Sequence, residues 1–225
     1  MMHSDAVAVI ATYNEAETIG ELVDGLLSSG LWVIVVDDDS PDGTAQIASS
    51  HGAMVEVRRG QRGIATAYVR ALQCGLALDA QYVVQMDAGG THFPEDAIGM
   101  LRVAEAGGFG LVIGSRFLEK GTTLKSHRTV ISLAAAWLIR VAGLPVHDAT
   151  SGFRVWRCDA LVSALRAGVR SEGNAFQLEL LWSAYRAGAR IAEHPIPYLL
   201  TNSQFRFSMV KEAMHVMGRI ARELI

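Results

Sequence analysis

Short hydrophobic runs alternate with amphipathic stretches along the first half of this chain of 225 residues. A short run rich in β-branched residues is typical of a buried strand, whereas apolar residues that recur every three or four positions indicate a helix. Their alternation predicts β–α–β units, whose strands run parallel. The expected fold class is α/β, with a mostly parallel central sheet and helices on both faces. The strands are expected at residues 6–11, 32–36, 54–57, 82–86 and 111–114.

The alternation ends near Arg116. Pro195 and Pro197 bracket a short segment, which we expect at an edge of the sheet because proline cannot donate a hydrogen bond to a neighbouring strand. The elements expected between these positions are a polar loop at 119–127, a long apolar helix at 130–146, a strand at 148–156 and two further helices.

The composition narrows the class of protein. Hydrophobic residues make up 50% of the chain and charged residues 19%, which fits one folded domain over 1–225. The net charge of −3, without a basic cluster, argues against a nucleic-acid partner. Cys74 and Cys158 give neither a disulfide framework nor a zinc pattern, and the N-terminus does not have the pattern of a signal peptide. A cytoplasmic location is therefore expected.

Three consecutive carboxylates, Asp37, Asp38 and Asp39, follow the strand expected at 32–36. A second strand ends in Asp87. Open α/β sheets bind ligands at the carboxyl ends of their strands, and adjacent carboxylates repel each other unless a cation or hydrogen-bond donors offset their charge. We therefore expect these two acidic strand ends to flank one site for a polar ligand.

The first strand leads directly into Thr12-Tyr13-Asn14-Glu15. A nucleoside suits this position, because the Tyr13 ring can stack on a base and the Glu15 carboxylate can accept hydrogen bonds from a base or a ribose. The alternative is structural, with Asn14 as a helix cap and Tyr13 as a packing residue. The absence of a Gly-x-Gly-x-x-Gly turn disfavours a nicotinamide-dependent enzyme.

These two segments, with several others in the same order, resemble family 2 glycosyltransferases with the GT-A fold, a nucleotide-diphospho-sugar transferase fold. Within that family the chain is similar to the polyprenol-phosphate (dolichol-phosphate) mannose synthase branch. The resemblance covers most of residues 6–200. The other segments are Arg62-Gly63-Ile64-Ala65-Thr66-Ala67-Tyr68, Met86-Asp87-Ala88, His92-x-Pro94, Gly114-Ser115-Arg116-Phe117 and Asp148-Ala149-Thr150-Ser151-Gly152-Phe153-Arg154.

The resemblance implies a nucleoside site at the ends of the first two strands. Asp38 would accept a hydrogen bond from the base, and Asp37 would support the turn. From their position before the next helix, Asp39 and Asp42 are expected to cap it. The nucleotide contacts that the resemblance implies are Ala11, Tyr13, Glu15, Val36, Asp38 and Ala88.

A divalent cation is the expected cofactor, because the family ends the fourth strand with Asp-x-Asp, which holds the cation against the diphosphate. This chain has Asp87-Ala88-Gly89, so the second carboxylate is missing. Mg²⁺ or Mn²⁺ would then be held by Asp87, the diphosphate and water, with the hydroxyl of Thr91 as a further donor. We expect this site to bind the cation more weakly than Asp-x-Asp does.

Three further catalytic residues are implied beside Asp87. Arg116 and Arg128 would neutralise the departing diphosphate, because guanidinium groups are suited to its oxygens. Asp148 is the candidate base. A lipid phosphate acceptor is already an anion near neutral pH, so with that acceptor Asp148 would instead orient Arg128 or a sugar hydroxyl.

The acceptor phosphate is expected to meet two parts of the chain. Ser151 and Arg154 belong to a segment that is too polar for a simple core strand, and a turn at Ser151-Gly152 is the structural alternative. Near the C-terminus, the family usually has an arginine and then a Gly-x-Ser-Lys element, which this chain lacks. Arg206 is the nearby cation that would replace the lysine.

The C-terminal helix expected at 208–225 has an apolar face and a basic face. Such a helix either covers its own domain or lies on an anionic membrane, and a lipid acceptor favours the membrane. The protein would then be peripheral at the inner face of the membrane. The apolar stretch 130–146 is interrupted by Arg140, Gly143 and Pro145, so we expect a buried or interfacial helix there and not a membrane span.

The expected function is inverting transfer of a sugar from a nucleotide-diphosphate donor to a polyprenyl phosphate, with mannose from GDP-mannose as the first candidate. Residues 1–116 would be the nucleotide-binding half of the domain, 117–207 the acceptor half and 208–225 the terminal helix. One alternative is a family 2 transferase acting on a sugar hydroxyl in surface polysaccharide synthesis, which requires a base. The other is a nucleotide-sugar-binding module that has lost catalysis along with the second carboxylate.

Overall fold

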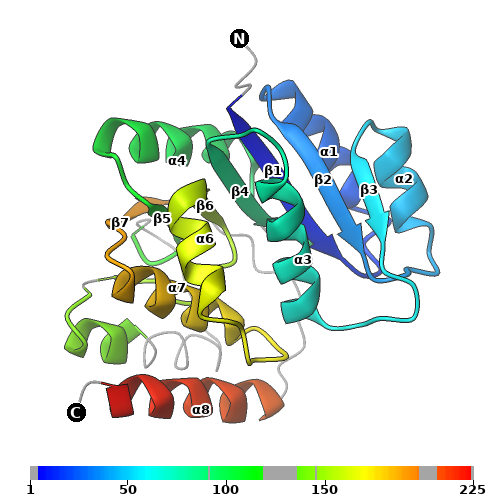
Figure 1. The fold of residues 1–225 in the computed structure, drawn as a ribbon. Helices are drawn as coiled ribbons and strands as arrows, with labels where there is room; N and C mark the ends of the chain where they lie inside the picture. The colour runs from blue at the N-terminus through cyan, green and yellow to red at the C-terminus, as the bar shows by residue number, and fades with distance from the viewer. Residues whose placement is uncertain (1–4, 91, 119–135, 145, 198–206, 224–225) are drawn as a thin grey trace.

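A seven-stranded sheet runs through the molecule (Figure 1). The computed structural model describes residues 5–90, 92–118, 136–144, 146–197 and 207–223. The strands are β1 (Ala6–Thr12), β2 (Trp32–Asp37), β3 (Met54–Val57), β4 (Tyr82–Asp87), β5 (Leu111–Ser115), β6 (Arg154–Arg157) and β7 (Ile191–Pro195). Within the described residues their order is β3-β2-β1-β4-β6-β5-β7. β6 is antiparallel to both of its neighbours and all other pairs are parallel, so the sheet is mostly parallel.

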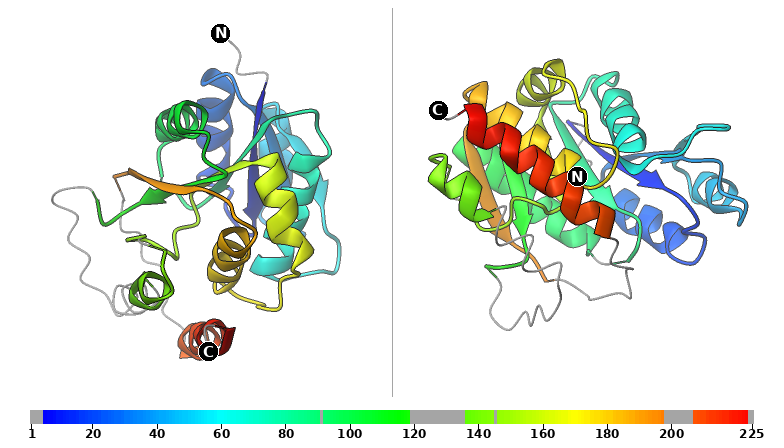
Figure 2. Two further views of the ribbon diagram at one scale, coloured as in Figure 1. Left: turned by 60° about the vertical axis from the view of Figure 1, so that its left-hand side comes forward. Right: turned by 90° about the horizontal axis from the view of Figure 1, so that it is seen from below.

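Helices cover both faces of the sheet (Figure 2). On one face are α1 (Ile19–Ser28), α2 (Thr44–Ser50) and α4 (Pro94–Gly107), and on the other α3 (Ile64–Leu76), α6 (Cys158–Arg166) and α7 (Phe176–Arg186), with α8 (Phe207–Glu223) packed on α7. Successive residues of β1 point to opposite faces, so Val7 and Val9 enter one core while Ala8 and Ile10 enter the other. The fold class expected from the sequence is confirmed.

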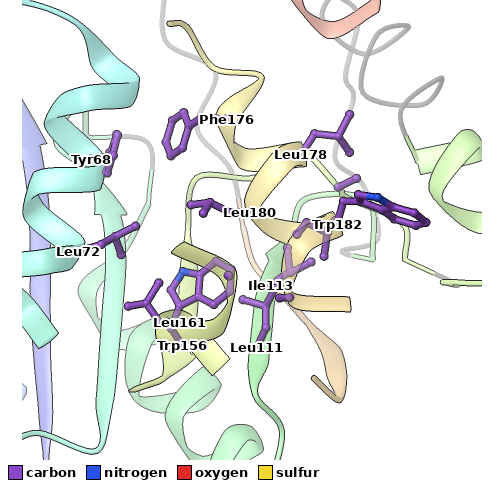
Figure 3. Packing of buried hydrophobic residues seen from close by; sticks show 14 of the residues in the cluster. Tyr68, Leu72, Leu111, Ile113, Trp156, Leu161, Phe176, Leu178, Leu180 and Trp182 are labelled. Carbon is purple, nitrogen blue, oxygen red and sulfur yellow. The ribbon is translucent and has the colours of Figure 1, made fainter. Parts of the chain in front are cut away.

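The core between the sheet and helices α3, α6 and α7 contains most of the buried aromatic rings (Figure 3). Trp156 is fully buried and donates its Nε1 hydrogen to Oε1 of Gln85 at 3.2 Å. Tyr68 stacks on Phe176 with ring centroids 5.3 Å apart. Because this stacking fixes the Tyr68 ring, it also fixes where the Tyr68 hydroxyl points at the end of β4.

The strands expected before residue 115 are confirmed, and their observed ends differ from the expected ones by no more than one residue. The edge segment was expected between Pro195 and Pro197, whereas the edge strand observed, β7, lies before it and ends at Pro195. The strand expected at 148–156 is shorter, because only Arg154–Arg157 pairs with β4 and β5. The polar residues before it do not join the sheet: the Asp148 carboxylate accepts from the Arg116 amide, and the Ser151 hydroxyl accepts from the Phe153 amide.

Part of the second half falls outside the described residues, including the loop expected at 119–127. Of the apolar stretch 130–146, residues 136–141 are helical, and Trp137 and Val141 are 66% and 62% exposed. Among the helices that the structure describes, none is both long and apolar enough to cross a bilayer.

Arg154 begins β6 and is fully buried. Its guanidinium donates to three backbone carbonyls, those of Ser151 (2.9 Å), Gln177 (2.8 Å) and Ala149 (2.9 Å). Burial lowers the pKa of Arg154, and the carboxylates of Asp148 and Asp87 act in the opposite direction. The expectation that Arg154 binds the acceptor phosphate is therefore wrong for this structure, since its donors are used inside the protein to join the 149–151 segment and α7 to the sheet.

Replacing Arg154 is expected to destabilise the fold. In Arg154→Met the three carbonyls lose their donors, each worth about 1 kcal/mol, so the free energy of unfolding should fall by roughly 3 kcal/mol. Urea denaturation followed by circular dichroism measures this change. Arg166→Met in α6, where the side chain is exposed, is the matched control and should change stability by less than about 0.5 kcal/mol. Equal losses in the two variants would contradict a structural role for Arg154.

Candidate active site

The carboxyl ends of β1, β2 and β4 lie side by side. β1 is the middle strand of the three, with Thr12 paired to Asp37 on one side and Ala11 paired to Asp87 on the other. The two acidic strand ends therefore flank one place, as the sequence predicted, and it is the place where open α/β sheets bind ligands.

The turn after β2 is held by Asp37. Its Oδ1 accepts hydrogen bonds from the hydroxyls of Thr12 (2.9 Å) and Ser40 (2.6 Å), and its Oδ2 accepts one from the Ser40 amide (2.8 Å). Asp37 is almost completely buried, so its charge is satisfied within the protein. The supporting role expected for Asp37 is what the structure shows.

Asp42 and Asp39 differ in their roles at the start of α2. Asp42 accepts from the hydroxyl (2.6 Å) and amide (3.0 Å) of Thr44 and from the Ala16 amide (3.2 Å), and the Thr44 hydrogen bond is the main cause of its lowered pKa. Asp39 is exposed and has a left-handed φ of 57°, a conformation that aspartate tolerates in turns. Asp42 therefore supports the helix start, whereas the capping role expected for Asp39 is wrong.

Asp38 is 4% exposed. Its Oδ2 accepts a hydrogen bond from the Gly63 amide at 2.9 Å, and its Oδ1 lies 3.4 Å from Nη1 of Arg58. Burial raises the pKa of Asp38, while Gly63 and Arg58 work against this rise. Arg58 was not among the expected site residues. It could have been predicted from its position just after β3, because ligands bind at the carboxyl ends of strands.

The aromatic ring expected to stack on a base is partly open to solvent. Tyr13 is 37% exposed, and the guanidinium carbon of Arg62 lies 4.1 Å from its ring centroid. The side chains of Val36 and Ala88 are buried in the two cores on opposite faces of the sheet. Ala11 is half-buried beside them.

Asp87 at the end of β4 is held from two sides and still has a side chain 40% exposed. Its Oδ1 accepts a hydrogen bond from the Tyr68 hydroxyl at 2.5 Å, and its Oδ2 lies 3.8 Å from Nε2 of buried His92. Burial acts to raise the pKa of Asp87, but His92, Tyr68 and Arg116 outweigh it and hold the pKa below its usual value. Tyr68 was missed as a site residue because a tyrosine in a helical pattern reads as core.

Gly152 lets the Asp148–Arg154 segment approach Asp87 closely. A Cβ atom at position 152 would stand 2.5 and 2.6 Å from the two Asp87 oxygens, closer than real Cβ contacts. No side chain fits at position 152, so the close approach of this turn to Asp87 requires glycine there. Ser151 is itself buried, and its hydroxyl accepts a hydrogen bond from the Phe153 amide at 3.3 Å. The Ser151 hydroxyl is thus used inside the protein. This favours the structural alternative, a turn at Ser151-Gly152, over the expected contact between Ser151 and the acceptor phosphate.

Two carboxylates fit the cation that the resemblance implies. Glu15 is half-buried, and its Oε1 would lie 3.8 Å from a Cβ at Gly89, the position of the missing aspartate. Burial raises the pKa of Glu15, and the negative charges of Asp87 and Asp42 raise it further. Within the described residues no three metal-ligating side chains surround one point, so Asp87 and Glu15 would need diphosphate and water oxygens to complete the coordination that Mg²⁺ or Mn²⁺ prefers.

Asp148 is fully buried and paired with Arg116. Its Oδ2 accepts from Nε (2.6 Å) and the amide (3.1 Å) of Arg116, and its Oδ1 accepts from Nη2 (2.7 Å), which also donates to the Thr150 hydroxyl (3.1 Å). A carboxylate occupied on both oxygens and closed to solvent cannot take a proton from an acceptor. The role of Asp148 as a base is thus contradicted, and the residue that it orients is Arg116.

Glu193 of β7 holds the other side of this loop. Its Oε1 accepts from the Asp148 amide and its Oε2 from the His147 amide, both at 2.8 Å. This contact could not be predicted, because Glu193 lies in a short edge segment with no motif around it. Of the other expected site residues, Thr91, Arg128 and Arg206 lie outside the residues that the structure describes.

Several solved structures are similar to this chain in shape. Glucosyl-3-phosphoglycerate synthase from Mycobacterium tuberculosis, in complex with Mn²⁺, UDP-glucose and phosphoglyceric acid, has a TM-score of 0.75 and 19% identity, and the match covers 96% of this chain and 79% of that one. Mannosyl-3-phosphoglycerate synthase from Rubrobacter xylanophilus gives 0.67 and 22%, with 97% and 73% covered. These likenesses show the GT-A fold.

The sequence comparisons are more specific. Polyprenol monophosphomannose synthase of Mycolicibacterium smegmatis is 33% identical over 222 residues, which cover 92% of this chain and 83% of the relative. Undecaprenyl-phosphate mannosyltransferase of Micrococcus luteus is 34% identical over 223 residues, covering 92% and 90%. A model of the family "Glycosyl transferase family 2" matches residues 7–163. The chain therefore belongs to glycosyltransferase family 2 and is a glycosyltransferase with the GT-A fold.

Proposed function

We propose that this enzyme transfers mannose from GDP-mannose to a polyprenyl phosphate, with inversion at the anomeric carbon. The observation that carries the choice of acceptor is the Arg116–Asp148 pair, which makes Asp148 unavailable as a base for a sugar hydroxyl. A lipid phosphate is already anionic near neutral pH and needs no base. The names of the two curated relatives, both of which describe mannosyl transfer to a lipid phosphate, support the same acceptor.

In the proposed reaction an oxygen of the acceptor phosphate attacks the anomeric carbon. The bond from that carbon to the diphosphate breaks, its electron pair goes to the departing oxygen, and GDP leaves. Negative charge therefore develops on the diphosphate. Arg116, which follows β5, provides fixed positive charge near Asp87 and lowers the pKa of Asp87. Because Asp148 and Thr150 hold the guanidinium in place, little reorganisation is needed as the charge develops.

Asp87 and Glu15 are the described side chains that would hold Mg²⁺ or Mn²⁺ at this site. When bound, the cation would supply further charge neutralisation for the diphosphate. Tyr68 and His92 orient the Asp87 carboxylate, and Tyr13 and Asp38 would hold the nucleoside at the ends of β1 and β2.

The direct test is a transfer assay with labelled GDP-mannose and undecaprenyl phosphate in detergent. Mannosyl lipid and GDP are expected as products, and Asp87→Asn should lower kcat by about two to three orders of magnitude because the diphosphate loses charge stabilisation. Asp39→Asn changes an exposed carboxylate of the neighbouring turn in the same way, and it should retain activity. Product on a sugar hydroxyl in place of the lipid would favour the polysaccharide alternative, and donor binding without turnover would favour a binding module.

The missing carboxylate gives a second test. Gly89→Asp is expected to tighten Mn²⁺ binding by about tenfold or more, because it adds a hard oxygen ligand beside Glu15 and Asp87. A Cβ at this position has room, with Glu15 Oε1 3.8 Å away. Electron paramagnetic resonance of free Mn²⁺, titrated in the presence of GDP, measures the affinity. Gly89→Asn is the uncharged control, and equal Mn²⁺ affinity in the two variants would argue against a cation at this site.

We propose further that the protein is cytoplasmic and binds the inner face of the membrane through the outward side of α8. The inward side packs on the domain through Ala213, Val216 and Ile220. Carboxylates fix it there, since Glu212 accepts from the Gly173 amide (2.6 Å) and Glu223 accepts from Trp182 Nε1 (2.7 Å).

The outward side of α8 combines charge and apolar surface. Lys211, His215 and Arg222 are exposed, and Met214 is 63% exposed between them. The helical segment 136–141, with exposed Trp137 and Val141, lies at the same end of the molecule (Figures 1 and 2). Basic and apolar side chains on one surface are typical of proteins that lie on anionic lipid.

Vesicle binding tests this surface. Each basic residue near an anionic membrane is worth about 1 kcal/mol, so Lys211→Gln with Arg222→Gln should weaken binding to phosphatidylglycerol vesicles about thirtyfold at low salt. Co-sedimentation measures the bound fraction. Replacing two exposed arginines elsewhere, Arg59→Gln with Arg166→Gln, is the matched control and should leave binding unchanged. An equal loss in both double variants would mean that net charge, and not the α8 surface, governs binding.

A further inference from the structure

The Glu193 carboxylate binds two consecutive backbone amides beside the active site. Its Oε1 accepts from the Asp148 amide, and its Oε2 accepts from the His147 amide, both at 2.8 Å. Oε2 also lies 2.7 Å from Nδ1 of His147. The Glu193 side chain is only 8% exposed, so these donors, and not bulk water, offset its charge. Short bonds from one charged group to two neighbouring amides hold that backbone in one position.

Two adjacent strands hold the two ends of Asp148. β7 lies beside β5 (Figure 1), in parallel register with Glu193 next to Ile113. Arg116 follows the end of β5 and binds the Asp148 carboxylate through Nε (2.6 Å) and Nη2 (2.7 Å). Asp148 is therefore held by its side chain from β5 and by its amide from β7. The backbone hydrogen bonds between these two strands complete a closed ring of contacts.

The position of Arg116 depends on this ring. Its guanidinium is bound by both oxygens of Asp148, so it follows any movement of that carboxylate. Asp148 lies in a loop and not in a strand, and Glu193 supplies the acceptor that a neighbouring strand would otherwise give to its amide. A shift of about 1 Å in a group that meets the substrate can lower the rate of a reaction about a hundredfold.

We propose that Glu193 is a positioning residue for the transfer reaction, which acts through Asp148 to keep Arg116 where negative charge develops on the departing diphosphate. Glu193 takes no part in the bond changes themselves. The inference rests on the proposed function and adds to it a residue of the edge strand.

Steady-state kinetics of mannose transfer test this role with Glu193→Gln. Glutamine has the same shape, but its side-chain nitrogen cannot accept a hydrogen bond, so one of the two backbone amides loses its acceptor. We expect kcat per folded molecule to fall roughly tenfold to a hundredfold, because a displaced donor loses part of its effect on the transition state. KM for GDP-mannose should change by less than about threefold, because the lost stabilisation concerns charge that develops during the reaction.

Glu179→Gln is the matched control. The Glu179 side chain is also 8% exposed and paired with a cationic side chain, that of Arg219, and its Oε2 accepts from the Arg170 and Ser171 amides, both at 3.0 Å. Both variants lose equivalent hydrogen bonds, so thermal melting should show similar losses of stability, whereas Glu179→Gln should keep the wild-type kcat per folded molecule. Equal kcat values in the two variants would overturn the inference, because Glu193 would then contribute to stability alone.

A double variant tests whether Glu193 acts through Arg116. Arg116→Lys keeps the positive charge but loses the fork that binds both oxygens of Asp148. In that background, Glu193→Gln should lower kcat by no more than about twofold, because effects that pass through one residue are not additive. A full additional loss of kcat would contradict the proposed route through Arg116.

NMR of arginine Nε–H groups follows Arg116 directly and needs no substrate. Glu193→Gln should shift or broaden the Arg116 signal, which Arg116→Lys identifies by removing it, and Glu179→Gln should leave that signal unchanged. An unchanged Arg116 signal in Glu193→Gln would overturn the inference while leaving the proposed function in place. Absence of mannosyl lipid with the wild-type protein would overturn the proposed function itself, and the NMR result would then decide whether Glu193 positions Arg116.

Discussion

The ion pair between Arg116 and Asp148 joins the two parts of the active site. It links the end of β5 to the loop before β6, and that loop carries Gly152 against Asp87. Behind it, Arg154 ties the same loop to the sheet through backbone carbonyls. Four charged groups of alternating sign thus follow one another, namely Asp87, Arg116, Asp148 and Arg154. Each buried charge has an opposite charge or hydrogen bonds to offset its desolvation. Without this pairing, Arg116 would lose the carboxylate that fixes its guanidinium beside Asp87.

The first five strands could be predicted because each is a short hydrophobic run between amphipathic helices, and local sequence is sufficient for that. The position of β6 could not be predicted. It follows β5 in sequence yet pairs with both β4 and β5 in antiparallel register, which depends on contacts between distant residues. Its expected start at residue 148 was too early, because the Asp148 carboxylate binds Arg116 after β5 and the Ser151 hydroxyl binds the Phe153 amide within the loop.

The site was predictable where polar residues follow a strand directly, as at Asp37, Asp38 and Asp87. It was not predictable where a polar side chain turns inwards. Arg154 and Asp148 look like ligand-binding residues in the sequence, since the sequence does not show whether a charge meets solvent or a buried partner. The opposite error concerns Tyr68, which resembles a core residue in α3 but donates its hydroxyl to Asp87. Both errors have one cause, which is that partners of buried polar groups come from other elements.

The glycine at position 89 changes how charge is balanced beside Asp87. An aspartate there would stand close to Glu15, whose pKa is already raised by burial and by the charges of Asp87 and Asp42. Three carboxylates in this space would repel one another unless a cation were bound. With glycine, the site holds less negative charge, while Arg116 stays fixed by Asp148 and Thr150. In the proposed reaction Arg116 therefore contributes more to neutralising the departing diphosphate than it would with an aspartate at position 89.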